Sequence, residues 1–280
     1  MTGSAPAMKK LKDKIVVVTG AASGIGQATA VEFAGNGADV LVSDVNEAGL
    51  AETVSAIEEK GRRAVAIRAD VSKREEVEGM INKAIDAFGR IDILMNNAGV
   101  GLSGEMRHLS LQDWEWIMGV NLWGPIYGIH FALPHLLKQR SGHIVNVASS
   151  AGLIASSCMS AYTTTKFGLV GLSEVLRNEL SRFEIGVTVV CPGFVRTNIF
   201  DVTEVRGMKN APRGEDLPSW LGISKEACAK NVLRAVQRNK FLIIPGPEMK
   251  VVYGFKRFAP FLYRGVTKMI GRQFERMSVD

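Results

Sequence analysis

Three side chains, Ser149, Tyr162 and Lys166, have the types and spacing needed to move a proton to or from a substrate oxygen. Tyr162 and Lys166 are four residues apart, so on a helix they share one face. A nearby ammonium group stabilises a phenolate and lowers the pKa of a tyrosine from about 10, which makes it usable as an acid or base near neutral pH. Ser149 ends an apolar run and could hydrogen-bond the same oxygen. The spacing is rare by chance in this composition and therefore predicts a catalytic group.

A glycine-rich turn follows the first apolar run of the chain and leads directly into a stretch of helical length. It reads Thr19-Gly20-Ala-Ala-Ser-Gly24-Ile-Gly26. Glycines allow a backbone to approach a pyrophosphate, whose charge is met by amide N–H groups at a helix N-terminus. The spacing departs from Gly-x-Gly-x-x-Gly, and a close strand-to-helix corner also needs glycine. The turn alone is therefore weak evidence for a dinucleotide site.

An acid strengthens the dinucleotide interpretation. Asp44 lies 24 residues beyond Gly20, at the end of the second apolar run, where a carboxylate can accept both ribose hydroxyls of an adenosine. Its charge would repel a 2′-phosphate, and neither Ser23 nor Val45 supplies a cation to hold one. NAD is therefore favoured over NADP. Taken alone, Asp44 could equally be a solvated acid that opens a turn.

The elements that must position these groups can be read from hydrophobic patterning. Short β-branched runs predict strands at 15–18, 40–42, 64–67, 91–95, 144–147, 187–190 and 241–244. Stretches of helical length lie between most of them, at 24–36, 46–59, 73–88, 111–138 and 161–183. Apolar strands that alternate with helices indicate parallel pairing with both sheet faces covered. The expected fold is a doubly wound, seven-stranded parallel α/β sheet of the Rossmann type.

Small and polar residues also follow the third and fourth predicted strands. Asp70 and Val71 close the third, and Asn96-Asn97-Ala98-Gly99 follows the fourth. Ligands of open α/β sheets bind at the carboxyl ends of the strands. The agreement of three neighbouring strand ends favours a nucleotide site at this edge.

Taken together, these motifs resemble the single-domain short-chain dehydrogenase/reductase family over residues 14 to about 200. The resemblance is carried by the glycine turn, Asn96-Asn-Ala-Gly, Ser149, Tyr162-x-x-x-Lys166, and Pro192-Gly193 with Thr197. It implies that cofactor contacts come from Gly20, Ser23, Gly24, Ile25, Gly26, Asp44, Asp70, Val71, Asn97, Ala98, Gly99, Tyr162, Lys166, Pro192, Gly193, Val195 and Thr197.

The resemblance also implies the reaction. Tyr162 would exchange a proton with the substrate oxygen, Ser149 would orient that oxygen, and Lys166 would lower the Tyr162 pKa and hold the nicotinamide ribose. Asn121 would be a fourth catalytic residue that shapes its helix and holds a water for proton relay. From the sequence alone Asn121 is ambiguous, because an asparagine inside a helix is usually a mild defect or a surface residue. The expected activity is the NAD-dependent interconversion of a secondary alcohol and a ketone.

Composition excludes several other classes of protein. The chain has 280 residues with 46% hydrophobic and 22% charged residues, and it contains no run of 18 apolar residues, so disorder and a membrane span are excluded. Residues 1–13 lack the apolar block of a secretory signal. Three widely spaced cysteines fit a reduced cytoplasm. The four histidines show no ligand spacing, so no metal is expected.

The net charge of +6 comes from one segment. Residues 249–276 hold seven cations against one acid, and the rest of the chain is neutral overall. A nucleic-acid binder would spread its charge over a domain face, so no nucleic-acid partner is expected. The expected organisation is a loose arm at 1–13, one dehydrogenase domain at 14–248 with a lid at 198–224, and a basic extension at 249–280.

The lid and the extension bear on the substrate and on partners. Apolar residues in and beside the lid suggest a lipophilic substrate such as a steroid or another lipid: Phe194, Ile199, Phe200, Trp220 and Leu221. Apolar residues recur every three to four positions from Val251, with cations between them and a break at Pro260, which is typical of a basic amphipathic helix. Packing within the chain or on a subunit is favoured, and peripheral contact with an anionic membrane through 250–276 is the second choice.

Several alternatives remain at this point. A homo-oligomer is expected, either a dimer or a tetramer, although the chain lacks the short Asp-Gly-Gly end with which many relatives assemble tetramers. An NAD(H)-binding redox sensor or a membrane-surface scaffold, both without turnover, would belong to other functional classes. A sensor has no need of Tyr162 as a proton-transfer group, and a scaffold leaves the glycine turn and Asp44 unexplained. The substrate and the direction of the reaction stay open.

Overall fold

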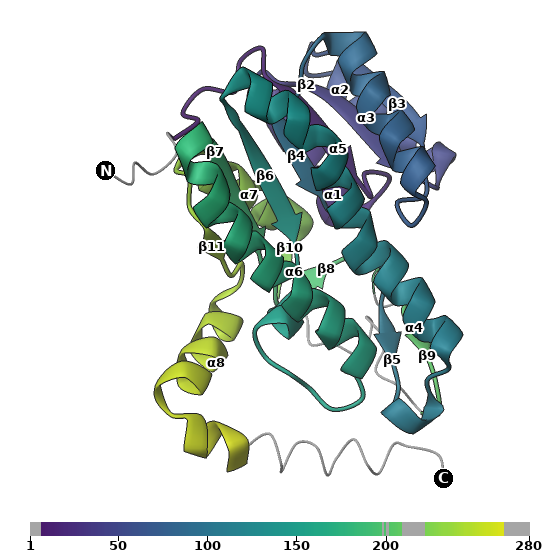
Figure 1. Ribbon diagram of the computed structural model, residues 1–280, viewed down its shortest axis with the longest axis vertical. Helices are drawn as coiled ribbons and strands as arrows, with labels where there is room; N and C mark the ends of the chain where they lie inside the picture. Colours follow the sequence, from purple (N-terminus) through teal and green to yellow (C-terminus); the bar gives the residue numbers. More distant parts are fainter. Residues whose placement is uncertain (1–6, 198, 200–201, 209–221, 266–280) are drawn as a thin grey trace.

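A parallel sheet of seven strands forms the centre of the protein. The computed structural model describes residues 7–197, 199, 202–208 and 222–265 (Figure 1). The sheet has the order β11-β7-β6-β4-β1-β2-β3. Its strands are β1 (Ile15–Thr19), β2 (Asp39–Asp44), β3 (Ala64–Arg68), β4 (Ile93–Asn96), β6 (Gly142–Val147), β7 (Ile185–Val190) and β11 (Leu242–Ile243). The predicted doubly wound, seven-stranded Rossmann-like fold is confirmed.

The central strands form because their residues are apolar on both faces of the sheet. Every residue of β1, β4, β6 and β7 is buried, as expected for parallel strands covered on two sides. The registers pair Val16 with Val40 and with Ile93, so β1 lies between β2 and β4. The strand order reverses on the two sides of β1 and β4, and ligands of such sheets bind at this switch point.

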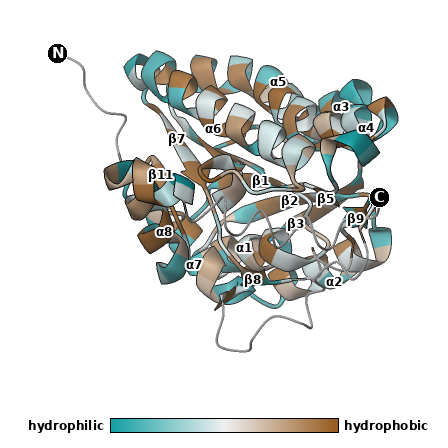
Figure 2. Cartoon of the chain, turned by 90° about the horizontal axis from the view of Figure 1, so that it is seen from below, coloured by the Kyte–Doolittle hydropathy of each residue, from teal (hydrophilic) through white to brown (hydrophobic). Residues whose placement is uncertain are grey.

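Helices cover both faces of the sheet, as Figure 2 shows from below. The helices are α1 (Gly24–Gly35), α2 (Glu47–Glu58), α3 (Arg74–Phe88), α4 (Leu111–Met118), α5 (Gly124–Gln139), α6 (Ser160–Leu180), α7 (Lys225–Gln237) and α8 (Pro247–Phe258). One core cluster joins α1, α2 and α7 to the sheet, with Phe33 and Val232 at its centre. A second joins α3, α5 and α6 to the other face, with Met80 and Leu136 fully buried.

The structure divides the stretch 111–138, which the sequence predicts as one helix. Helix α4 ends at Met118, a π-helical turn η2 covers Gly119–Trp123, and α5 begins at Gly124. A π-turn adds a residue to the helical register and commonly marks a functional position. Asn121 lies in the middle of this turn and is fully buried. The extra residue changes the helical register, and the Asn121 side chain therefore points into the protein.

Four short strands and one helix were not among the predicted elements. Strand β5 (Leu102–Ser103) pairs with β9 (Glu204–Val205), and β8 (Val195–Arg196) pairs with β10 (Ile223–Ser224). Helix α7 precedes β11 and packs against α1. Within the residues that the structure describes, no helix is long and apolar enough to span a membrane.

Candidate active site and cofactor cradle

Tyr162 and Lys166 lie on the first turns of α6, with their side chains directed to the carboxyl ends of β6 and β7. The Lys166 Nζ is buried, donates to the Val147 carbonyl oxygen at 3.2 Å and lies 5.6 Å from the centroid of the Tyr162 ring. Tyr162 is partly buried and packs against Leu102 and Ile117. The helix therefore places a phenol and an ammonium side by side, as the four-residue spacing predicts.

Burial dominates the electrostatics of this pair. Removal from water raises the pKa of Tyr162 above its usual value of 10, and a hydrogen bond with Ser149 opposes part of that increase. Burial lowers the pKa of Lys166 to about 8. The sequence predicts a lowered Tyr162 pKa, but the structure gives the opposite direction, because burial of the phenol makes the largest contribution. Tyr162 is accordingly protonated at neutral pH.

Ser149 joins the pair from the loop after β6. Its hydroxyl shares a hydrogen bond with Tyr162 and also accepts from the Ala151 amide at 3.1 Å, which fixes its position. Cys191, directly after β7, is fully buried next to Ser149 and Lys166. Burial raises the pKa of the Cys191 thiol to about 12, so it stays protonated and is no nucleophile at neutral pH.

Asn121 connects the π-turn to the loop that follows β4. Its Oδ1 accepts from the Val100 amide at 2.9 Å and its Nδ2 donates to the Val100 carbonyl oxygen at 2.9 Å. Nδ2 also lies 3.4 Å from the Thr165 hydroxyl, next to Lys166. A methyl group added at Gly99 would lie 3.2 Å from the Asn121 Oδ1 and 3.4 Å from the Lys166 Nζ, so both side chains adjoin this loop. Asn121 is therefore a buried residue that ties the π-turn to the loop after β4, and it is not a surface residue.

We expect Asn121→Ala to lower the free energy of unfolding by about 2–3 kcal/mol, because both backbone groups of Val100 lose their partner. Urea denaturation checks this value. Asn36→Ala is the matched control, since its side chain bonds only the exposed Glu32 carbonyl and its loss should change stability by less than about 0.5 kcal/mol. Equal stability of Asn121→Ala and the unmodified protein would contradict the connecting role.

The glycine turn forms a cradle at the N-terminus of α1. Gly20 has φ +63°, and a methyl group there would lie 2.7 Å from the Ala98 Cα. A methyl group at Gly26 would overlap the Gly20 carbonyl oxygen. Ser23 is the N-cap, yet its side chain makes no capping hydrogen bond, and the first turn holds no acid. The first amides of α1 are thus available to an anion.

Gly24 and Ile25 open this helix beside a second segment of the site. Gly24 adopts φ +57°, and Thr197 lies next to it, so that a methyl group at Gly24 would be 3.3 Å from the Thr197 Cγ2. Ile25 is half-buried and packs against the core cluster beneath α1. The turn after β1 and the segment after β7 therefore face each other across the carboxyl edge of the sheet.

The loop after β4 locks the cradle in place. The Asn97 Nδ2 donates to the carbonyl oxygens of Thr19 and Gly20, each at 2.9 Å. The Asn97 and Ala98 amides both donate to the Thr19 hydroxyl, at 3.0 and 3.1 Å. The predicted Asn97 and Ala98 therefore fix the glycine turn by hydrogen bonds, while Gly99 adjoins Asn121 and Lys166.

The two predicted acids occupy different surroundings. The Asp44 carboxylate accepts from the Ala22 amide and from the Asn46 amide, both at 3.0 Å, so it lies against the glycine turn and keeps lone pairs for a ligand. The Asp70 carboxylate accepts from the amide and hydroxyl of Ser72 and caps the turn before α3. Val71 is buried against Gly124.

The segment after β7 closes the remaining side of the site. The Pro192 carbonyl oxygen accepts from the Ser150 amide at 2.7 Å, which joins this segment to the loop of Ser149. Val195 is buried in β8. A methyl group at Gly193 would overlap Met249, so the first turn of α8 packs directly on this segment. The sequence gives no motif for that contact.

The structure describes only part of the predicted lid at 198–224, and Phe200, Trp220 and Leu221 lie outside the described residues. The part that is described is tied to α4. The Arg206 guanidinium pairs with Asp113 at 3.0 Å and with Glu204 at 2.9 Å. Asp113 also completes the capping box of α4 with Ser110. This network holds β9 over the same end of the sheet as Tyr162.

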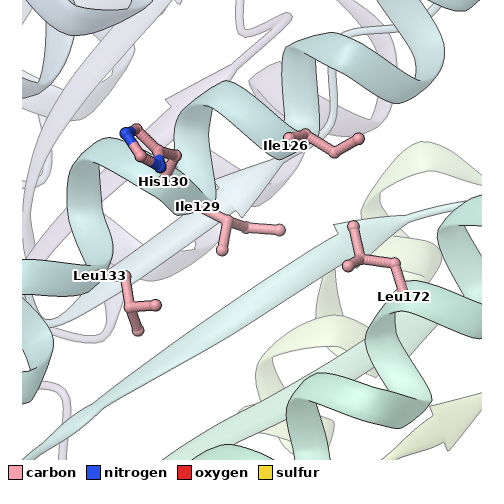
Figure 3. Close-up of a pocket in the computed structure, with 5 residues that line it drawn as sticks. All are labelled: Ile126, Ile129, His130, Leu133 and Leu172. Atoms are coloured by element: carbon pink, nitrogen blue, oxygen red, sulfur yellow. The ribbon is translucent and has the colours of Figure 1, made fainter.

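A separate shallow pocket lies between α5 and α6, away from these groups. Figure 3 shows its lining, which is Ile126, Ile129, His130, Leu133 and Leu172. The lining is apolar apart from His130 and includes none of the predicted site residues. Within the part of the chain that the structure describes, no group of three or more His, Cys, Asp or Glu side chains could hold a metal ion.

Comparison with known proteins agrees with this arrangement. Residues 14–205 match the family model described as short chain dehydrogenase. The chain belongs to the short-chain dehydrogenase family. A solved short-chain dehydrogenase also aligns with nearly the whole chain, so the resemblance drawn from the motifs is confirmed at the level of the family.

Three relatives are informative about this short-chain dehydrogenase. A CLA biosynthesis dehydrogenase/reductase of Lactiplantibacillus plantarum is 34% identical over 259 residues, covering 86% of this chain and 91% of the relative. A (2S)-[(R)-hydroxy(phenyl)methyl]succinyl-CoA dehydrogenase subunit of Thauera aromatica is 38% identical, covering 68% and 77%. A crystal structure of a short-chain dehydrogenase/reductase from Burkholderia phymatum in complex with NAD has a TM-score of 0.82 and 32% identity, covering 91% and 96%.

Proposed function

We propose that this protein is an NAD-dependent oxidoreductase that interconverts a secondary alcohol and a ketone. The observation that carries the proposal is the assembly of Ser149, Tyr162 and Lys166 at the carboxyl edge of the sheet, beside a glycine cradle whose helix amides lack a cap. The cradle suits a dinucleotide, because a diphosphate can meet the first amides of α1 and a ribose can meet Asp44.

The residues divide the work of the reaction. In alcohol oxidation Tyr162 acts as phenolate and accepts the hydroxyl proton at its Oη, while Ser149 donates a hydrogen bond that orients the substrate oxygen. Lys166 stabilises the phenolate by its charge and, next to Gly99, would hold the nicotinamide ribose of a bound cofactor. NAD, when bound, supplies the hydride acceptor. In ketone reduction the Tyr162 phenol returns the proton.

The pH dependence of the two directions tests this assignment. Because burial raises the Tyr162 pKa, the phenol that reduction needs predominates at neutral pH and the phenolate that oxidation needs is scarce. We expect kcat/KM for alcohol oxidation to rise with pH, by up to about tenfold per unit, and ketone reduction to stay level near neutral pH. Initial rates with NAD and NADH over a pH series measure this. An oxidation rate that falls as pH rises would contradict it.

The preference for NAD depends on Asp44. We expect Asp44→Asn to raise the ratio of NADP to NAD efficiency by roughly tenfold, because the amide keeps the shape and a hydrogen-bonding oxygen but removes the charge that repels a 2′-phosphate. The measurement is kcat/KM for both cofactors. Asp86→Asn, an exposed acid on α3, is the control and should leave the ratio unchanged. Equal use of NAD and NADP by the unmodified protein would refute the role of Asp44.

The substrate that we propose is lipophilic. Tyr162 packs against an apolar cluster that contains Leu102 and Ile117, so the surroundings of its ring are apolar. The Thauera aromatica relative is named for a substrate that carries a hydroxy(phenyl)methyl group, which is a secondary alcohol next to an apolar ring. Both observations favour a secondary alcohol or ketone whose reacting carbon lies next to an apolar group.

We also propose that the protein forms a homo-oligomer through α5 and α6. The shallow pocket between these helices is lined mainly by apolar side chains. Val175 is exposed on α6, and Trp123 is exposed at the end of η2, directly before α5. Apolar helix faces of this kind usually meet protein. Light scattering of the purified chain tests the assembly.

A further inference from the structure

Helix α8 and the helical residues 260–265 that follow it present apolar side chains to solvent. These side chains, which we call the α8 apolar surface, are Val251, Val252, Phe255, Phe258, Phe261 and Leu262. Phe258 is 85% exposed and Phe261 83%. The α8 apolar surface holds six of the fourteen large hydrophobic side chains that are exposed in the described part of the chain, within twelve residues. Such a concentration marks an interaction site.

The opposite side of α8 is anchored to the protein. Met249 packs on Gly193, and Tyr253 and Tyr263 pack against the cluster that contains Leu153. The Lys256 Nζ donates to the Leu153 carbonyl oxygen and lies 5.1 Å from the centroid of the Phe167 ring. The predicted intramolecular packing thus accounts for one side of the helix. It leaves the α8 apolar surface on the other side without cover among the described residues.

The charges of α8 distinguish between the partners that the α8 apolar surface could bind. Residues 247–265 contain one acid, Glu248, and residues 251–262 contain none. Apart from Lys256, which is on the anchored side, the cations of this stretch are Lys250, Arg257 and Arg264. A second copy in a two-fold contact would bring these cations together. An anionic lipid surface pairs with the cations and receives the aromatic side chains between them.

Helix α8 lies at the periphery of the molecule, where it can contact a membrane surface. Figure 1 shows α8 at the end of the molecule toward which β6 points, and Figure 2 shows it at the periphery with apolar segments along it. Lys250 and Arg257 are exposed on the same helix, at a spacing of seven residues that places them on one side. We propose that α8 is a peripheral membrane-binding helix that recognises anionic lipid.

Vesicle flotation of the full-length protein tests this proposal. We expect the protein to float with phosphatidylcholine vesicles that contain phosphatidylglycerol and not with phosphatidylcholine alone, and binding should weaken as salt is added. Phe258→Ser/Phe261→Ser should reduce binding to the anionic vesicles about tenfold through loss of buried apolar area. Lys250→Glu/Arg257→Glu should reduce it by about the same factor through reversal of charge.

Two matched variants serve as controls. Met106→Ser/Leu111→Ser removes two exposed apolar side chains near α4, and Lys60→Glu/Lys83→Glu reverses two exposed cations near α2 and on α3. Both should bind the anionic vesicles like the unmodified protein, and thermal unfolding should show that all variants are folded. Equal flotation of Phe258→Ser/Phe261→Ser and the unmodified protein overturns the proposal, as does no binding to anionic vesicles. A change of oligomeric state in that variant, with vesicle binding unchanged, assigns the surface to a second copy.

Discussion

Tyr162→Phe should reduce turnover about 10²–10⁴-fold while leaving the Kd for NAD within about twofold, because the change deletes only the oxygen that exchanges a proton with the substrate. The ring keeps its packing against Leu102 and Ile117, and Lys166 keeps its bond to the Val147 carbonyl oxygen. Steady-state rates in both directions and cofactor titration by intrinsic fluorescence measure the two quantities. The loss should appear in kcat and not in the affinity for NAD.

Tyr127→Phe is the control for this substitution. Tyr127 lies on α5 and its ring stacks on Trp123 at 5.7 Å, so loss of its hydroxyl should leave turnover unchanged. Ser149→Ala offers a second comparison, since it removes the hydroxyl that bonds Tyr162 and should also reduce kcat. Persistent turnover in Tyr162→Phe would show that the acid/base assignment is wrong.

Gly26→Ala should weaken NAD binding by about a hundredfold, because the added methyl group overlaps the Gly20 carbonyl oxygen and forces the cradle open. The Asn97 amide, which bonds that same carbonyl at 2.9 Å, is displaced with it. The first amides of α1 then no longer point at the place where a diphosphate would lie. Cofactor titration by fluorescence measures the affinity.

Gly35→Ala, at the other end of α1, separates this effect from helix propensity. No atom lies within 4 Å of a methyl group added at Gly35, so NAD affinity should be unchanged and stability should rise by up to about 1 kcal/mol. Circular dichroism establishes that Gly26→Ala is folded before its affinity is compared. A folded Gly26→Ala that binds NAD like the unmodified protein would refute the cradle.

The sheet was predictable because each of its strands carries its own signal. The β-branched runs from Ile15, Val40 and Val187 are buried on both faces, so local sequence and final environment agree. The alternation of strands and helices indicates the parallel pairing, while the strand order itself is seen only in the structure. The spacing of Tyr162 and Lys166 likewise gives their shared face from helical geometry alone.

Features that depend on distant contacts were not predictable. Nothing near Asn121 in the sequence shows that a π-turn directs it to Val100, a residue 21 positions away. The pairing of Leu102 with Glu204 and the packing of Met249 on Gly193 also join segments far apart in the chain. The direction of the Tyr162 pKa shift depends on how much water the fold removes, which no spacing reveals.

The central claim is that Ser149, Tyr162 and Lys166 catalyse hydride exchange between a lipophilic secondary alcohol and NAD. The most direct test is NADH formation by the purified protein across a panel of secondary alcohols, steroids and long-chain 3-hydroxy compounds, with NAD and NADP compared and the ketones tested in reverse. We expect turnover with NAD on apolar members of the panel. Tight NAD binding without turnover of any member in either direction would contradict the claim and favour a redox sensor.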